Sequence, residues 1–159
     1  MLNPALAGDT SPIQWKKDYT VPEMELVGRT RPPLFGDGFN LRKEAADAFD
    51  TMRRAAGAEG INMYSASSFR SFNRQKGIWN RKYIKYTKEG KSPQEAIRAI
   101  IEYSTLPGSS RHHWGTDLDI IDTAVPQPKD HPLIATHFHE GGAYQKLFEW
   151  LLKHANKYG

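Results

Sequence analysis

The sequence predicts an α+β fold in which a few short strands lie among several amphipathic helices. Helical periodicity of apolar residues marks four segments: 41–60, 71–90, 92–104 and 144–159. Two short apolar runs, 61–67 and 116–121, are typical of strands. A chain of 159 residues, 38% of them hydrophobic, can bury one core. We therefore expect a single domain over residues 1–159, with an irregular segment at 1–40 and the main body at 41–159.

The N-terminal third predicts little regular structure before its first long helix. Residues 19–27, YTVPEMELV, suggest a short strand interrupted by Pro22. Residues 31–40 are rich in Pro and Gly and are expected to form a loop. Asn40 is the expected N-cap of helix 41–60. The face of that helix expected to turn inward holds Leu41, Ala45, Ala48, Phe49, Met52 and Ala56.

The other helices have recognisable ends and faces. The helix that starts near Ser71 carries a stripe expected to pack in the core: Ile78, Trp79, Tyr83 and Tyr86. The next helix has a complete start signal, with Ser92 as cap, Pro93 in the first turn and Glu95 closing a capping box. For the last helix we expect an inward face of Leu147, Phe148, Leu151 and Leu152, with Gly159 at its C-terminal end.

Composition excludes some classes of protein. The absence of Cys excludes disulfides, thiolate metal sites and a cysteine nucleophile. The net charge of +4 suits an anionic partner, either a nucleic acid or a carboxylate-bearing or wall polymer. Basic residues concentrate only at 74–91 and no recognition motif accompanies them, so no nucleic-acid partner is expected. No apolar run approaches the roughly 18 residues of a membrane span, and the first residues lack the features of a signal peptide.

The stretch SSRHHWGTDLDI, residues 109–120, could hold part of a metal site. A turn through Gly115 would join His112 to a strand holding Asp119, with Asp117 on the same face of that strand. Zinc accepts both imidazole nitrogen and carboxylate oxygen. The neighbouring His113 cannot easily aim at the same point and is expected to pack or to hydrogen-bond. By spacing alone, the alternative is that His112 and Asp119 are structural or solvated.

A second candidate for chemistry lies at the start of the helix near Ser71. Arg70 sits just before this helix N-terminus, where anions are favoured and a cation is unusual. A bound carboxylate or polarised carbonyl would account for Arg70, and Gln75 could add a donor one turn later. The alternative is an arginine paired with a surface acid.

Together these segments resemble the VanY-type zinc D-alanyl-D-alanine carboxypeptidases, over roughly residues 40–159. The family pattern S-x-H-x-x-G-x-A-x-D is matched by Ser110, His112, Gly115 and Asp119, with Asp117 in place of the alanine. The pattern S-x-[YF]-R-S-x-x-x-Q is matched by residues 67–71 with Gln75. The closing FEWLLKHANKYG is similar to a helix of the same family.

The resemblance implies a hedgehog-like metallopeptidase fold with a small central antiparallel sheet flanked by helices. It implies Zn²⁺ bound by His112 and Asp119, with Arg70 holding the substrate and stabilising the oxyanion. It also implies substrate contacts from Gln75 and Ser110, and a supporting role behind the ligands for Asp117 and His113. The expected reaction is hydrolysis of the terminal D-alanine of peptidoglycan stem peptides, with D,D- or L,D-specificity, by a monomer in the bacterial cell envelope or periplasm.

One family element has no match in the sequence. The resemblance implies a third ligand and a glutamate base in an E-x-x-H segment after the closing helix, and none follows residue 119. We expect this segment beyond Gly159, which would leave the core incomplete at its C-terminus. His137, His139 and Glu140 are substitute candidates, although they precede the helix. The alternative function is a non-catalytic module that binds wall peptide.

Overall fold

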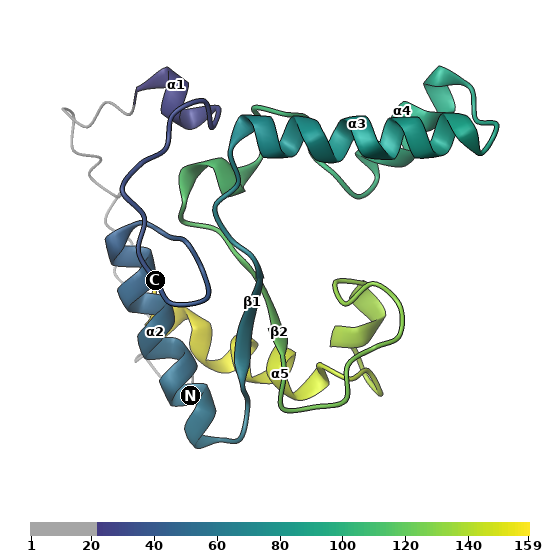
Figure 1. Cartoon of the computed structure of the whole chain (residues 1–159). Helices are drawn as coiled ribbons and strands as arrows, with labels where there is room; N and C mark the ends of the chain where they lie inside the picture. The colour runs from purple at the N-terminus through teal and green to yellow at the C-terminus, as the bar shows by residue number, and fades with distance from the viewer. Residues whose placement is uncertain (1–21) are drawn as a thin grey trace, which may run out of the picture.

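The computed structural model describes residues 22–159, which fold into five α-helices, two strands and three short 3₁₀ turns in this part of the chain (Figure 1). The helices are α1 (Glu23–Leu26), α2 (Lys43–Ala58), α3 (Phe72–Lys88), α4 (Pro93–Ile101) and α5 (Gln145–His154). The strands are β1 (Met63–Ser67) and β2 (Asp119–Asp122), and the turns are η2 (Arg111–Trp114), η3 (Ala135–Phe138) and η4 (Ala155–Lys157). The predicted α+β class is confirmed. The single domain over residues 1–159 stays a prediction.

The two strands pair antiparallel, as expected, with one irregularity in their register. Tyr64 faces Ile121 and Ser65 faces Ile120, but Ser67 faces Asp119, so Ala66 is an extra residue on β1. Residues paired across two strands share a face of the sheet. The bulge therefore turns Ser67 to the face of Asp119, whereas a regular alternation would leave it on the face of Ser65.

The hydrophobic core lies where α2 and α5 pack around the strands, as Figure 1 shows. Phe39 and Phe49 meet edge to face inside it, with ring centroids 5.0 Å apart. Trp150 of α5 is buried and donates from Nε1 to Glu59, so its polar edge is satisfied. The fully or nearly buried members are Phe39, Leu41, Ala46, Phe49, Ala56, Ile61, Met63, Ile121, Tyr144, Leu147 and Trp150.

Helix α2 begins two residues later than predicted. Leu41 forms a bridge with Phe35, and the carbonyl of Asn40 accepts from the amide of Phe69. Because residues 40 and 41 are held in extended pairing, Arg42 takes the N-cap position instead of Asn40. The bond to Phe69 connects the chain just after the end of β1 to the segment that leads into α2.

Helices α3 and α4 form a hairpin that extends away from the strands (Figure 1). The capping box of Ser92 and Glu95 is present, and Ala96 and Ile100 are buried, as the helical pattern indicates. The stripe of α3 is placed differently from the prediction. Trp79 is only partly buried and Tyr83 is 36% exposed, because α3 packs on α4 and contributes nothing to the central core.

Two further predictions about local structure were wrong. Residues 23–26 of the suspected strand at 19–27 form α1, while residues 19–21 lie outside the described part. Leu152 does not face inward and is 71% exposed, whereas Trp150 takes its place in the core. Trp150 follows Leu147 by three residues, close to one helical turn, so the two share a face of α5. Leu152 follows Leu147 by five residues and therefore lies on another face. Within residues 22–159, no helix is long and apolar enough to cross a membrane.

Candidate active site

His112 lies in η2 and is almost completely buried. Its Nδ1 atom is 3.2 Å from the backbone carbonyl oxygen of Asp117. A carbonyl can only accept, so a proton belongs on Nδ1, and Nε2 is the nitrogen left to face another partner. Fixing the imidazole through one nitrogen in this way is the usual arrangement of a metal-binding histidine.

Asp119, the first residue of β2, faces that free nitrogen. Its Oδ2 atom lies 3.2 Å from Nε2 of His112. The interaction with His112 lowers the pKa of Asp119, partly against the effect of burial, and Arg70 and Arg111 lower it further. The carboxylate is thus ionised at neutral pH, as metal binding requires.

Gly115 makes the turn between these two residues possible. It ends η2 with φ of +69°, in the left-handed region that glycine adopts without strain. Its carbonyl accepts from the amide of Arg42, and a Cβ at this position would lie 3.1 Å from Leu34 Cδ2. The turn is therefore packed against the start of α2.

The pair His112 and Asp119 fits two corners of a zinc site. Two ligand atoms about 2.0–2.1 Å from a tetrahedral ion lie about 3.3 Å apart, close to the separation seen here. Among the described residues, no group of three His, Cys, Asp or Glu is arranged to hold a metal. His137 instead contacts Asp130 at 2.8 Å, and the ring of His139 packs on Phe148. The suggested H-x-H-E ligands are not brought to His112.

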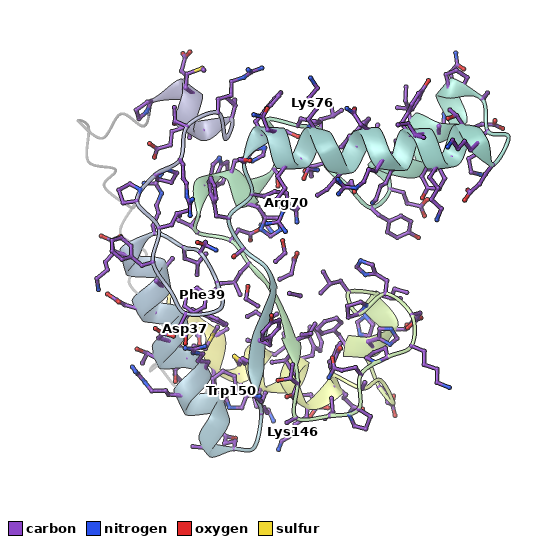
Figure 2. All side chains as sticks on the ribbon, in the orientation of Figure 1. Asp37, Phe39, Arg70, Lys76, Lys146 and Trp150 are labelled. Atoms are coloured by element: carbon purple, nitrogen blue, oxygen red, sulfur yellow. The ribbon has the colours of Figure 1, made fainter. Side chains whose placement is uncertain are left out.

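Arg70 projects from the segment that joins β1 to α3 (Figure 2), and its charge interacts with that of Asp119. Its guanidinium donates to Ser67 Oγ at 2.7 Å and to Gln75 Oε1 at 2.8 Å. Burial lowers the pKa of Arg70, and the nearby Asp119 opposes this effect. An arginine remains charged under such conditions and has five N–H donors, so two protein acceptors leave donors for a ligand. The expected alternative, pairing with a surface acid, is not what the structure shows.

Gln75 and Ser110 occupy different positions relative to Arg70. Gln75 is fully buried, and its amide group bonds both Arg70 and, at 2.7 Å, the carbonyl of Thr105. These contacts favour a role in holding Arg70, and its substrate contact stays a prediction. Ser110 is buried and occupies the N-cap position of η2. Its side chain makes no capping hydrogen bond to that turn.

His113 points away from the pair, as its adjacency to His112 predicts. It is fully buried, and its Nδ1 contacts the carbonyl of Arg70 while Nε2 accepts from the amide of Gly108 at 3.0 Å. The amide of Arg70 in turn donates to the carbonyl of His112 at 3.0 Å. The two halves of the site are thus fastened through the backbone of one residue, which sequence patterns do not reveal.

Asp117 contacts the site from its outer edge. Its carboxylate lies 3.3 Å from Arg111 and 3.5 Å from Nδ1 of His112. The shorter contact to His112, however, comes from the backbone carbonyl of Asp117. A supporting role for the carboxylate therefore stays a prediction.

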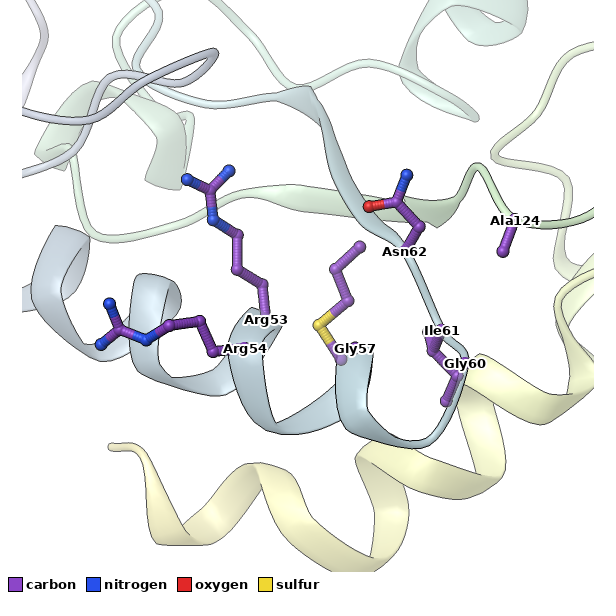
Figure 3. A pocket seen from close by; sticks show the side chains of 8 residues that line it. Arg53, Arg54, Gly57, Gly60, Ile61, Asn62 and Ala124 are labelled. Atoms are coloured by element: carbon purple, nitrogen blue, oxygen red, sulfur yellow. The ribbon is translucent and has the colours of Figure 1, made fainter.

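One cavity of the molecule is separate from this site. A cavity of about 450 Å³ lies at the other end of β1 from Arg70, lined by residues such as Arg53, Asn62 and Ala124 (Figure 3). None of its lining residues belongs to the groups described above.

Comparisons with known proteins show the family of the chain. Residues 38–159 match the family model VanY, described as D-alanyl-D-alanine carboxypeptidase. The chain is 38% identical over 80 residues to the protein named "Putative carboxypeptidase YodJ" of Bacillus subtilis (strain 168). It is also 38% identical over 68 residues to an uncharacterized protein of Haemophilus influenzae (strain ATCC 51907 / DSM 11121 / KW20 / Rd). These matches take in 50% and 39% of this chain, and the chain spans only 26% and 46% of those two proteins.

Solved structures share the fold. VanYB in complex with D-alanine-D-alanine superposes with a TM-score of 0.62 at 19% identity, over 82% of this chain and 65% of that one. A VanY D,D-pentapeptidase variant in complex with Zn(II) gives 0.56 at 20% identity, over 77% and 61%. The LD-carboxypeptidase LdcB gives 0.50 at 30% identity, over 76% and 48%.

Proposed function

Because the chain belongs to the VanY D-alanyl-D-alanine carboxypeptidase family, we propose that it is a zinc-dependent carboxypeptidase acting on peptidoglycan stem peptides. The observation that carries the proposal is the 3.2 Å approach of His112 Nε2 to Asp119 Oδ2 beside the clamped Arg70. One neighbour of the same fold was crystallised with Zn(II) and another with D-alanine-D-alanine, which supports this choice of metal and ligand.

In this proposal, His112 and Asp119 hold the metal through Nε2 and Oδ2. The hydrogen bond from Nδ1 to the Asp117 carbonyl keeps the imidazole oriented and in the correct tautomer. Zinc, when bound, would polarise the scissile carbonyl and lower the pKa of its water to about 7. The removal of the water's proton is the expected task of a glutamate, and the described residues offer no assigned base.

Arg70 would bind the peptide next to the metal. Ser67 and Gln75 fix the plane of its guanidinium, so its remaining donors point in a set direction before the substrate arrives. A planar fork of donors suits a carboxylate or a developing oxyanion. D,D- against L,D-selectivity would then depend on the shape of the pocket around the terminal residue.

Zinc binding and D-alanine release test the proposal together. We expect the protein to bind one equivalent of zinc by calorimetry and to release D-alanine from a stem pentapeptide. His112→Ala should abolish metal binding, and Arg70→Ala should weaken peptide binding while leaving zinc binding unchanged. His131→Ala, which removes an exposed histidine elsewhere, is the matched control.

Two other outcomes are informative. Peptide binding without release of D-alanine would favour the alternative, a wall-peptide binding module of the same fold. Zinc binding that survives His112→Ala would refute the ligand assignment, whatever the activity.

A further inference from the structure

A second pocket lies on the other side of the segment that carries Arg70. This open pocket of about 310 Å³ is built from the loop after α1, the segment before α2 and the start of α3. Phe69 and Ser71 line it, whereas the Arg70 guanidinium between them turns to Ser67 and Gln75. Its full lining is Gly28, Arg29, Thr30, Arg31, Asn40, Phe69, Ser71 and Arg74.

Three of the lining residues are arginines and none is acidic. Arg29 stacks on the ring of Phe72, with its Cζ 4.1 Å from the ring centroid. Arg31 donates to Asn40 Oδ1 at 3.4 Å. Within residues 22–159, no carboxylate lies within ion-pair distance of Arg29, Arg31 or Arg74.

Three arginines outside the pocket are paired with acids, whereas Arg54, Arg81 and Arg98 form no ion pair among the described residues. Arg42 contacts Glu25, Arg53 lies 2.9 Å from Asp50, and Arg111 lies 3.3 Å from Asp117. What distinguishes the pocket is that three arginines without ion pairs in the described part of the chain line the same space and no acidic residue lines it.

The backbone adds to this positive potential. Helix α3 has 17 residues and begins at the pocket with Ser71 as its N-cap. Helix starts carry partial positive charge and usually attract acidic side chains, but the first turn of α3 has none. Repulsion among the three guanidiniums and the helix end is relieved if an anion binds between them.

We propose that this pocket binds an oxyanion, the phosphate or carboxylate group of a larger ligand, at a place separate from the His112 and Asp119 pair. Guanidinium groups bind both kinds of oxyanion through paired N–H donors. Arg29 is preset by stacking and Arg31 by its bond to Asn40, while Arg74 closes the pocket from α3. A ligand held here would contact a surface that the proposed hydrolysis does not use.

Titration of the ¹⁵N-labelled protein with glycerol phosphate, and separately with glutarate, tests this site. We expect amide shifts centred on Gly28, Asn40 and Ser71 that saturate at millimolar ligand and weaken as salt is raised. Arg74→Gln should weaken the binding about tenfold, as loss of charge-assisted hydrogen bonds implies. Arg81→Gln is the matched control, because it removes the same charge from the same helix outside the pocket.

The two probes separate the sources of the oxyanion. Saturable shifts with glycerol phosphate alone would identify a phosphate ligand, and shifts with glutarate alone a carboxylate. The proposal is overturned if neither probe shifts these amides, if Arg81→Gln weakens binding as much as Arg74→Gln, or if the shifts centre on His112 and Arg70. The Arg74→Gln protein should keep its zinc affinity, so failure of this site and failure of the proposed function are distinguishable.

Discussion

Nε2 of His112 and Oδ2 of Asp119 lie 3.2 Å apart, at the separation of two ligands on one tetrahedral ion. Asp117 stands two residues before Asp119, but its contact to the histidine at hydrogen-bond distance comes from a backbone carbonyl. The two aspartates therefore form a natural pair for comparison.

We expect Asp119→Asn to lower zinc affinity by more than about 100-fold, beyond the about 10–100-fold effect of supporting residues. Asp117→Asn should have a much smaller effect, because the carbonyl that orients His112 remains. Competition with a chromophoric chelator measures both. Equal losses in the two variants would contradict the assignment of Asp119 as the direct ligand.

Gly115→Ala should destabilise the fold and also disturb the site. The residue has φ of +69°, and a left-handed alanine costs roughly 1–2 kcal/mol. Gly38→Ala is the control, since Gly38 has φ of +78° but open space where a Cβ would lie. Urea denaturation should show a similar backbone cost in both variants, with an added loss in Gly115→Ala from the contact with Leu34.

Only Gly115→Ala should reduce zinc affinity, because only this glycine joins His112 to Asp119. If Gly38→Ala reduced zinc affinity to the same degree, the loss would reflect general destabilisation and not the turn.

Gln75→Leu should weaken both the fold and the hold on Arg70. The substitution removes the acceptor at 2.8 Å from Arg70 and leaves a charged donor without its partner, which costs about 1–3 kcal/mol in the free energy of unfolding. Thr105 keeps the bond from Trp79 Nε1, so the damage should concentrate at Arg70. Denaturant midpoints and the affinity for D-alanyl-D-alanine peptides measure the two effects. The exposed Gln94→Leu should change neither.

The capping box of α4 predicts a pH dependence of this helix. Hydrogen bonds from Ser92 lower the pKa of Glu95 below its ordinary value of 4.5. The stabilisation is therefore present above that ordinary pKa and is lost as the pH falls through the lower pKa of the folded state. Protection factors of the α4 amides, which correct for the intrinsic pH dependence of exchange, should fall at acid pH in the native protein. Glu95→Gln should remove this dependence, and an unchanged profile would contradict it.

Elements with local signals could be predicted from the sequence. The capping box of Ser92 and Glu95 marks the start of α4, and Ser71 caps α3 where expected. The start of α2 could not be predicted, because the bridge between Leu41 and Phe35 depends on a contact between separate parts of the chain.

The candidate site was predictable only in part, for a similar reason. The spacing of His112 and Asp119 follows from one turn and one strand, and the sequence shows both. Ser67 as the partner of Arg70 depends on the bulge at Ala66, and the arginine pocket depends on tertiary contacts of the loop that holds Arg29 and Arg31. Such relationships leave no periodic pattern in the sequence.

The unpaired Ala66 determines that Ser67 and Asp119 lie on the same face of the sheet. In a perfectly regular ladder, the hydroxyl that anchors Arg70 and the carboxylate of Asp119 would face opposite sides of the sheet. If Ala66 paired with Asp119 instead, Ser67 would turn to the opposite face of the sheet, and the anchor of Arg70 would no longer lie on the same side as the proposed metal ligand. The bulge in the pairing of β1 and β2 thus allows one ligand to contact groups positioned by both strands.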